Sequence, residues 1–271
     1  MSGMTARVRA LIGKELVDQR RNPGLFLPVV IVAIVAIMLP LIVAVIIPRL
    51  ANEKLSDSSD FEVAVEMYRD QPATRALDPE GAIQAFIFQY FLLIFMLIPV
   101  TCAMSVAASS IVGEKQSRAL EPLLATPITT IELLGAKVLG SLLPSIGMSV
   151  ACLAIYLLTV ILFARPGVVW AMLGPRSLGV VFLLGPLAAL AALQLAVCVS
   201  SRVNDARTAQ QLGVTVILPI VGLFISQLMG AFTLNGPVIL AIAAGLVVIN
   251  AGLMAVAVRV FDRETILTRW K

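Results

Sequence analysis

The sequence contains no histidine, only three cysteines and few charges, and each shortage excludes a class of function. Charged residues make up 13% of the chain and hydrophobic residues 59%. The long apolar stretches therefore lack the usual groups of metal sites, proton relays and hydrolytic centres, since they hold neither histidine nor carboxylate. Cys102, Cys152 and Cys198 all lie within these stretches, where we expect them to pack as small residues rather than form disulfides or bind metal.

Six apolar stretches contain none of the charged residues. A charge near the bilayer centre costs about 2.5–3.5 kcal/mol, and a spanning helix needs about 20 apolar residues. Continuous apolar runs, rather than alternating ones, disfavour a barrel. The predicted fold class is therefore an all-α membrane protein. Its six transmembrane helices are expected at Leu25–Ile47, Ile83–Val112, Val138–Phe163, Ser177–Ser200, Ala209–Phe232 and Pro237–Val258.

The basic residues predict how the chain is oriented in the membrane. With six spans both termini lie on one side, and that side carries fourteen of the twenty Lys and Arg residues. Loops rich in Lys and Arg stay in the cytoplasm, so both termini are expected there. No basic patch with interleaved aromatic residues occurs, so the excess of positive charge indicates contact with anionic lipid rather than with nucleic acid.

Residues 1–24 are expected to form an interfacial segment on the cytoplasmic side. Val8, Leu11, Ile12 and Leu16 make an apolar stripe along a helix predicted at Thr5–Arg21, and Asn22-Pro23-Gly24 ends it. A basic amphipathic helix next to a span lies in the membrane interface. It serves either as a lipid anchor or as a lever that also touches a cytoplasmic partner.

Residues 25–271 then form the membrane domain, with one sizeable external segment at residues 48–82. Ser59 and Glu62 have the spacing of a helix-capping pair, which predicts one short helix on the outer surface before Pro72. The segment is too short to bury a core of its own.

The cytoplasmic loop at residues 113–128 joins the second and third predicted spans. Glu114 and Arg118 are four residues apart, the spacing of an ion pair on a helix. The loop also carries three leucines that are exposed unless a partner covers them: Leu120, Leu123 and Leu124. A short, charged helix with leucines on it suits docking into a groove of another protein. An ordinary loop lying against the bilayer is the alternative.

Residues 112–128 read VGEKQSRALEPLLATPI, and ELLGAK follows at residues 132–137. This pattern resembles the signature of ABC-2 type transporter permeases, in which a Glu and a basic residue precede E-x-L-L-x-S/T-P, followed by E-L/I-L/I-x-G/A-K. Arg118-Ala119 and Pro122 depart from the usual pattern. The resemblance extends over nearly the whole chain, from the lead-in helix through the six spans.

The resemblance implies a half-transporter of the type V exporter fold in the plasma or inner membrane of a prokaryotic cell. Such permeases pair as dimers, here expected to be homodimers, and dock two separate ATP-binding-cassette ATPase subunits. ATP and Mg²⁺ would bind in those subunits, and this chain, which has no G-x-x-x-x-G-K-S/T loop, would bind no cofactor and catalyse no hydrolysis. The resemblance places the ATPase-coupling contact at Glu114, Lys115, Arg118, Leu120, Glu121, Leu123, Leu124 and Pro127.

The second and fifth predicted spans carry small and aromatic residues at helical spacing. The resembled family has these spans facing a central cavity, which implies the pathway residues Phe88, Phe91, Phe95, Thr101, Ser105, Ser109 and Ser226. The stripe of Gly222, Ser226 and Gly230 is expected at the dimer contact. Small residues four apart also allow close helix packing, which is the alternative for each small-residue stripe, and a position facing lipid is the alternative for the three phenylalanines. Gln194, Gln227 and Asn250 are expected to make hydrogen bonds between helices.

The functional hypothesis is thus the membrane subunit of an ATP-driven exporter. The alternative is an ATP-independent secondary transporter or channel, which predicts ionisable residues in the membrane or broken helices around an ion site. The charge-free spans argue against proton coupling.

Overall fold

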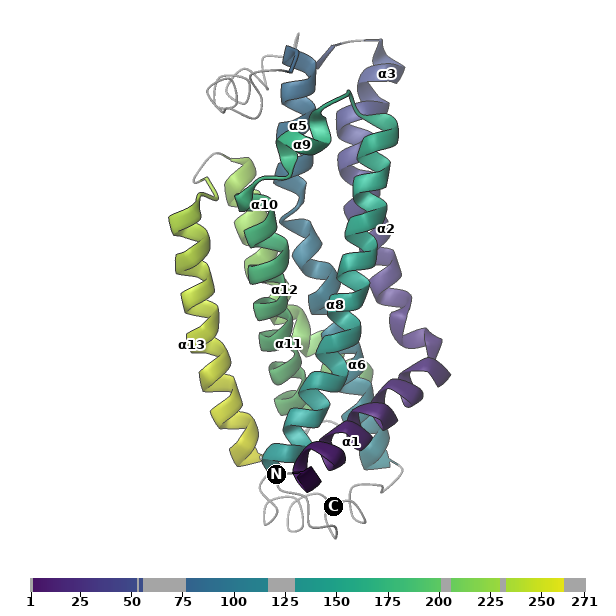
Figure 1. The fold of residues 1–271 in the computed structure, drawn as a ribbon, viewed down its shortest axis with the longest axis vertical. Coiled ribbons are helices and arrows are strands. Elements are labelled where there is room, and N and C mark those ends of the chain that lie inside the picture. Colours follow the sequence, from purple (N-terminus) through teal and green to yellow (C-terminus); the bar gives the residue numbers. More distant parts are fainter. Residues whose placement is uncertain are drawn as a thin grey trace.

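A computed structural model describes residues 2–52, 54–55, 77–116, 130–200, 206–229 and 233–260. Every regular element within these ranges is a helix, so the predicted all-α class is confirmed for them (Figure 1). The helices are α1 (Ser2–Arg21), α2 (Leu27–Leu41), α3 (Ile47–Ala51), α5 (Pro79–Phe91), α6 (Leu97–Gln116), α8 (Thr130–Phe163), α9 (Val168–Met172), α10 (Pro175–Gly179), α11 (Gly185–Ser200), α12 (Ala206–Leu228) and α13 (Gly236–Val260). The surface helix predicted around Ser59 falls outside the described residues.

Several spans are interrupted by short turns of another helix type. The 3₁₀ turns η1 (Pro23–Phe26) and η5 (Ile94–Met96) precede α2 and α6, and the π turns η2 (Ile42–Ile46) and η6 (Val180–Leu184) follow α2 and α10. Each of these turns lies within six residues of a proline, namely Pro23, Pro48, Pro99 and Pro186. Proline lacks the backbone N–H that would continue the helical ladder.

Five helical segments in the described residues are long and apolar enough to cross a membrane. They are Pro23–Ala51, Pro79–Ser110, Leu134–Phe163, Pro175–Ser200 and Gly236–Arg259. The remaining predicted span corresponds to α12, whose apolar part within the described residues is Thr215–Leu228. The structure thus shows five of the six predicted spans at full length.

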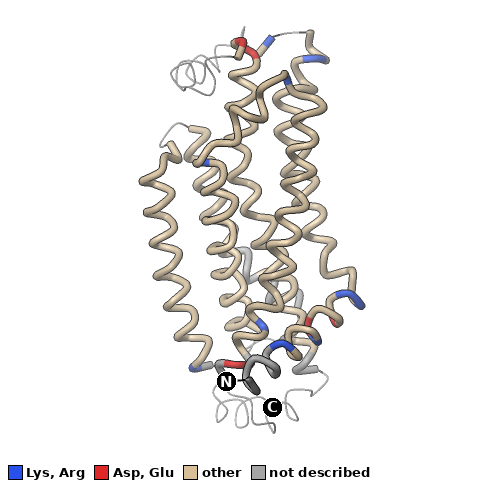
Figure 2. Tube along the Cα trace, viewed as in Figure 1, with Lys and Arg blue, Asp and Glu red and all other residues tan. Residues whose placement is uncertain are grey.

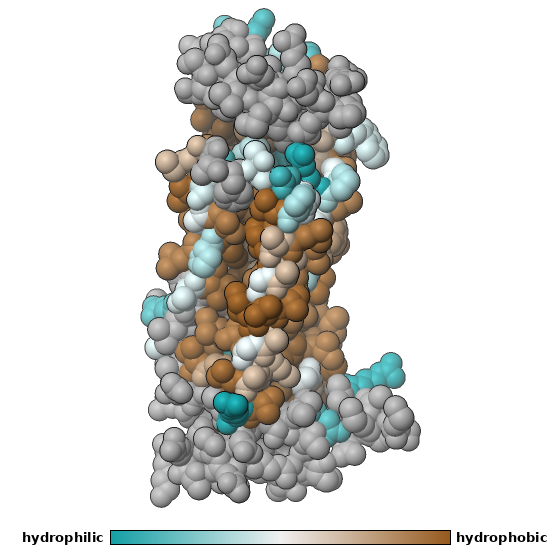
Figure 3. All heavy atoms as spheres, turned by 90° about the vertical axis from the view of Figure 1, so that its left-hand side faces the viewer, coloured by the Kyte–Doolittle hydropathy of each residue, from teal (hydrophilic) through white to brown (hydrophobic). Residues whose placement is uncertain are grey.

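Among the described residues, the charged positions lie toward the two ends of the helical bundle (Figure 2). Apolar side chains cover the middle of the face shown in Figure 3. The helix α1 crosses one end of the bundle, and α13 finishes at the same end (Figure 1). This division into a charge-free middle and two charged ends fits a protein that spans a bilayer.

The second predicted span, built from α5, η5 and α6, is the central element of the fold. Within its most apolar window 83% is buried inside the protein, compared with 17% for the span at α13. It packs against α11, α8, α12 and α2. On α11 the contact is made mostly by alanines, including Ala188, Ala192 and Ala196, and such small residues let two helices approach closely.

Candidate functional site

The predicted coupling loop lies between α6 and α8. Glu114 and Lys115 lie in the last turn of α6, so the helical extension predicted there is confirmed. The other predicted contact residues fall outside the described residues: Arg118, Leu120, Glu121, Leu123, Leu124 and Pro127. The described ends of the loop are therefore Gln116 on α6 and Thr130 on α8.

A buried polar network joins α1 to both helices that flank this loop. Lys137 Nζ on α8 lies 3.1 Å from Glu15 Oε1 on α1, and the two side chains are only 4% and 8% exposed. Ser110 on α6 donates its hydroxyl to Glu15 Oε2 at 2.8 Å. Its oxygen accepts a hydrogen bond from Lys137 Nζ at 2.9 Å. One carboxylate, one ammonium and one hydroxyl from three helices thus meet at a single point.

A second contact one turn along α1 reinforces the first. Gln19 Nε2 donates to the carbonyl oxygen of Gly140 on α8 at 3.0 Å. A Cβ atom added at Gly140 would lie 3.0 Å from Glu15 Cβ, closer than side chains normally pack. Glycine is therefore the residue that allows α1 to lie this close to α8.

The contact uses the same face of α1 as the predicted apolar stripe, because Glu15 and Gln19 fall between Leu11, Ile12 and Leu16 by the helical repeat. Glu15 and Gln19 are buried, whereas Leu11, Ile12 and Leu16 are only partly buried. The helix predicted at Thr5–Arg21 is confirmed, but no periodicity in the sequence pairs Glu15 with a lysine more than a hundred residues later. The shared E-L-L-G-A-K motif, which ends at Lys137, is the one sequence signal that marks this site.

A cavity of about 330 Å³ opens beside the network, between α1 and α6. Its lining includes Glu15, Gln19, Asn22, Ser109 and Ser110. The predicted pathway residue Ser109 therefore borders this cavity rather than a closed helix contact. Its hydroxyl donates to the carbonyl of Ser105 at 2.8 Å.

The aromatic pathway candidates pack inside the protein. Phe88 and Phe95 are fully buried, with ring centroids 6.0 and 4.7 Å from that of Tyr156 on α8. Phe91 packs edge-on against Phe224 on α12, with centroids 5.2 Å apart. The structure thus brings these three phenylalanines together with aromatic residues of two neighbouring helices.

The small residues on the two spans have different surroundings. Ser105 is buried and donates to the carbonyl of Leu25 in η1 at 2.8 Å, whereas Thr101 is partly exposed and donates to Leu97 in its own helix at 2.6 Å. On α12, Gly222 is exposed and Ser226 is partly buried. Gly230 falls outside the described residues.

The central span is broken in the middle, and Tyr156 occupies the break. The backbone N–H of Leu92 donates to the carbonyl of Gln89 at 3.3 Å. In a continuous α-helix it would donate to the carbonyl of Phe88, four residues earlier. The Tyr156 hydroxyl, fully buried, donates to the Phe88 carbonyl at 2.8 Å. Sequence reasoning missed Tyr156, because nothing in an apolar span marks one tyrosine as the partner of a broken helix.

The polar residues predicted to link helices are partly accounted for. Asn250 on α13 donates to the carbonyl of Leu187 on α11 at 3.0 Å, which confirms an interhelical hydrogen bond. The side-chain oxygens of Gln194, Gln227 and Asn250 are buried and accept no hydrogen bond from the described residues.

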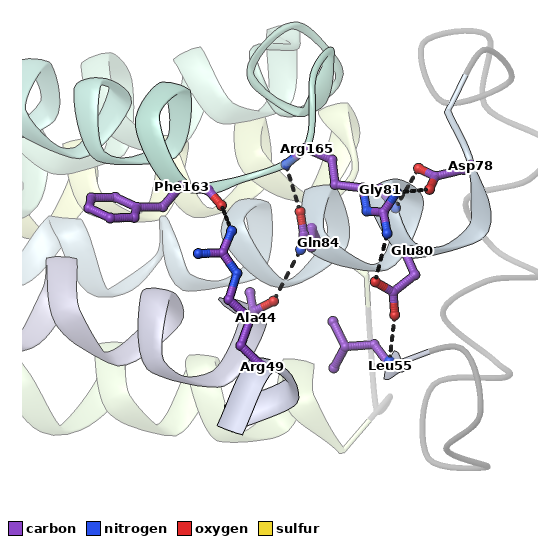
Figure 4. Close-up of polar contacts among 9 residues, drawn as sticks. All are labelled: Ala44, Arg49, Leu55, Asp78, Glu80, Gly81, Gln84, Phe163 and Arg165. Carbon is purple, nitrogen blue, oxygen red and sulfur yellow. Dashed lines mark hydrogen bonds and ion pairs between the residues drawn. The ribbon is translucent and has the colours of Figure 1, made fainter. Parts of the chain in front are cut away.

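At the opposite end of the bundle, Gln84 fastens the start of the central span to two neighbouring segments (Figure 4). Pro48 has no N–H to donate to the carbonyl four residues earlier, which belongs to Ala44 in η2. Gln84 Nε2 donates to this carbonyl at 3.3 Å. Gln84 Oε1 accepts the backbone N–H of Arg165 at 3.0 Å.

Charged side chains extend the same connection toward the surface (Figure 4). Arg165 pairs with Asp78 at 2.7 Å and with Glu80 at 3.5 Å, and Glu80 accepts the Leu55 N–H at 2.7 Å. Arg49 donates to the carbonyl of Phe163 at 2.9 Å. Arg49, Glu80 and Arg165 line a cavity of about 410 Å³, and these contacts tie together the ends of three spans.

The fold and these sites define the class of the molecule: a polytopic helical membrane protein with a helix fastened across one end of the bundle. A family model described as ABC-2 family transporter protein matches residues 9–258. The chain belongs to this family, and it is therefore a transporter membrane subunit without an ATPase domain of its own. Comparison with curated proteins and with solved structures finds no match. The family assignment inferred from the loop at residues 112–137 is confirmed.

Proposed function

We propose that the chain is one half of the membrane part of an ATP-binding-cassette exporter, with six spans, both termini in the cytoplasm and the type V exporter fold. Two copies form the substrate pathway and dock two separate ATPase subunits, which bind ATP and Mg²⁺. Membership of the ABC-2 family implies ATPase partners. The observation that carries the proposal is the family signature between α6 and α8, at the end of the bundle crossed by α1 (Figure 1).

The position of the loop indicates how ATP would drive transport. The loop joins the ends of two long helices, α6 and α8, so any displacement of the loop is applied to both. ATP binding that draws the two ATPase subunits together would shift the loops of both copies. Since a ligand shifts a conformational equilibrium only by its differential affinity for the two states, the ATPase must bind the loop differently before and after closure.

The exposed side of α12 supports a contact with a second copy. Gly222 is exposed, and a Cβ added there would meet no atom within 4 Å, so the backbone is open to approach. Small residues in this position favour close contact between membrane helices. We place the dimer contact at Gly222, Ser226 and Gly230.

The pathway residues remain part of the same proposal: Phe88, Phe91, Phe95, Thr101, Ser105, Ser109 and Ser226. Thr101, Ser109 and Ser226 are partly exposed in the single chain. They therefore need the smallest rearrangement to line a pathway between two copies. The buried phenylalanines would reach it only if α5 and η5 moved relative to α8 and α12.

The first test measures ATPase docking at the loop. Affinity-tagged permease should capture an ATP-binding-cassette ATPase, identified by mass spectrometry, and the complex in proteoliposomes should hydrolyse ATP at a rate set by the permease. Glu121→Lys, or Leu123→Asp with Leu124→Asp, should reduce ATPase capture about tenfold or more, since buried apolar anchors carry most of a binding free energy.

A matched control separates docking from folding. The permease variants should insert and form dimers normally, because the altered residues lie outside the predicted spans. Trp170→Asp, at an 80% exposed position on α9 at the other end of the bundle, should leave ATPase capture unchanged. Unchanged capture and hydrolysis in both loop variants would refute the proposed coupling loop.

A further inference from the structure

We propose that Glu15, Ser110 and Lys137 are positioning residues that fasten α1 to the two helices flanking the coupling loop, so that α1, α6 and α8 move as one unit. This inference rests on the proposed coupling of the loop to an ATPase. Ser110 lies about two turns before the end of α6, and Lys137 lies two turns after the start of α8. The network, which acts as a clamp, therefore contacts the helices on both sides of the loop, each about two turns away from it.

The burial of the ion pair distinguishes this clamp from a lipid anchor. A carboxylate on a helix that only lies in the headgroup region would face water or headgroups. Here the Glu15 side chain is 8% exposed and the Lys137 side chain 4%, and each has the other as its opposite charge at 3.1 Å. Removing one member takes this opposite charge away from the buried charge that remains, which is unfavourable. The pair thus holds α1 in one position against the bundle.

Two attachment points fix the direction of α1 as well as its position. The first is Glu15, and the second is the hydrogen bond from Gln19 to the Gly140 carbonyl one turn further along. A helix held at one point can pivot, whereas a helix held at two points on the same neighbour cannot. The close approach of α1 to α8 at Gly140 also hinders sliding of one helix along the other.

A third contact carries the connection into the first span. Ser105, five residues before Ser110 on α6, donates to the carbonyl of Leu25 in η1 at 2.8 Å. The segment from Glu15 through η1 into α2 is thus fastened to α6 at both ends. Movement of the loop would therefore reach the first span through α1 as well as the second and third spans directly.

The test measures a conformational change rather than transport, because a conformational change can be followed without knowing the substrate. Spin labels at Trp170→Cys report the distance between the outer ends of the two copies, in a background where Cys102, Cys152 and Cys198 are replaced by alanine. The captured ATPase is present with and without ATP. Without captured ATPase, or without an ATP-dependent distance change in the unmodified network, the proposed function itself fails and this inference fails with it.

Once the wild-type protein shows an ATP-dependent distance change, charge variants test the role of the Glu15, Ser110 and Lys137 network. Glu15→Gln and Lys137→Met should leave ATPase capture within about twofold of wild type and weaken the ATP-dependent shift between states about fivefold or more, the lower range of typical coupling. The exchange Glu15→Lys with Lys137→Glu can rebuild all three contacts and should restore the shift. Full response in both single variants would overturn the clamp.

A disulfide between α1 and α8 tests whether the ATP response needs the attachment of α1 itself or only a stable protein. Glu15→Cys with Gly140→Cys removes the ion pair and places the two Cβ atoms 3.0 Å apart, slightly closer than the roughly 3.5–4.5 Å of a disulfide, so α1 must shift outward by a few tenths of an ångström for the bond to form. The reduced variant should respond weakly to ATP, and oxidation should restore the response because the bond refastens α1. Gly147→Ala on the same helix, where a Cβ meets nothing within 4 Å, is the control and should respond like wild type. Loss of response on oxidation would show that α1 must leave α8 during the cycle, which would overturn the proposal.

Discussion

At the scale of single residues, the most informative groups are those that satisfy backbone carbonyls released by breaks in the spans. The membrane interior supplies no water, so a freed carbonyl there needs a partner from the protein. Tyr156 supplies one for Phe88, and Gln84 supplies one for Ala44. Both donors come from a different span, so each break also links two helices.

Tyr156→Phe should destabilise the protein by about 1–3 kcal/mol, because it leaves the Phe88 carbonyl buried without a hydrogen bond while keeping the ring packing. The measurement is the free energy of unfolding in mixed detergent micelles. Thr159→Val is the control on the same helix, since Thr159 is only partly buried and its hydroxyl donates to the carbonyl of Ile155 in its own helix. Equal losses in the two variants would show that the Phe88 carbonyl finds another partner.

At the scale of elements, the sequence predicts the helices better than their contacts. Apolar length and proline positions were enough for five spans and for the helix at α1. The polar contact within the docking face of α1 was not predictable, because Glu15 and Lys137 are 122 residues apart and the hydropathy pattern marks only the apolar residues of that face. The break in the central span was missed for a similar reason: it depends on Tyr156 from another helix.

The residues of the predicted coupling loop show what a sequence motif does not predict. The motif at residues 112–128 identified the family, yet most of its side chains lie outside the described residues. Motif spacing reflects what a partner needs to recognise, and it carries no information on how the partner is oriented. The described ends of the loop, Gln116 and Thr130, therefore place the site without giving its contacts.

Pro48 and Gln84 test whether two elements depend on each other as the geometry indicates. Gln84→Leu should cost about 1–3 kcal/mol, since the Ala44 carbonyl loses its donor. In a Pro48→Ala background the restored N–H can reach that carbonyl, so the same change should cost about 1 kcal/mol less, within the usual range of coupling between contacting residues. A double-mutant cycle on the free energy of unfolding measures the difference. Strict additivity would show that Pro48 is not the reason why Ala44 needs Gln84.

At the scale of the whole molecule, the two ends of the bundle are built differently. One end fastens α1 across the helices that flank the loop, through a buried ion pair. The other end ties the outer parts of three spans together through partly exposed charges around a cavity (Figure 4). A buried pair resists separation more strongly than an exposed one, because exposed pairs contribute only about 0–1 kcal/mol. If the chain works as proposed, the end away from α1 is thus the one that opens at the lower cost.

The proposed dimer is the assembly on which this division of roles depends, and a substitution at Gly222 tests it. Gly222→Leu should place a large side chain where the backbone of α12 is open, and so weaken association of two copies about tenfold or more if the helices meet there. Gly252→Leu on α13 is the matched control, because that glycine is also exposed with open space around it. Association is measured by energy transfer between differently labelled copies as the lipid-to-protein ratio is raised. Weakened association in the Gly252 variant alone would move the contact to α13, and unchanged association in the Gly222 variant would exclude α12 from the dimer interface.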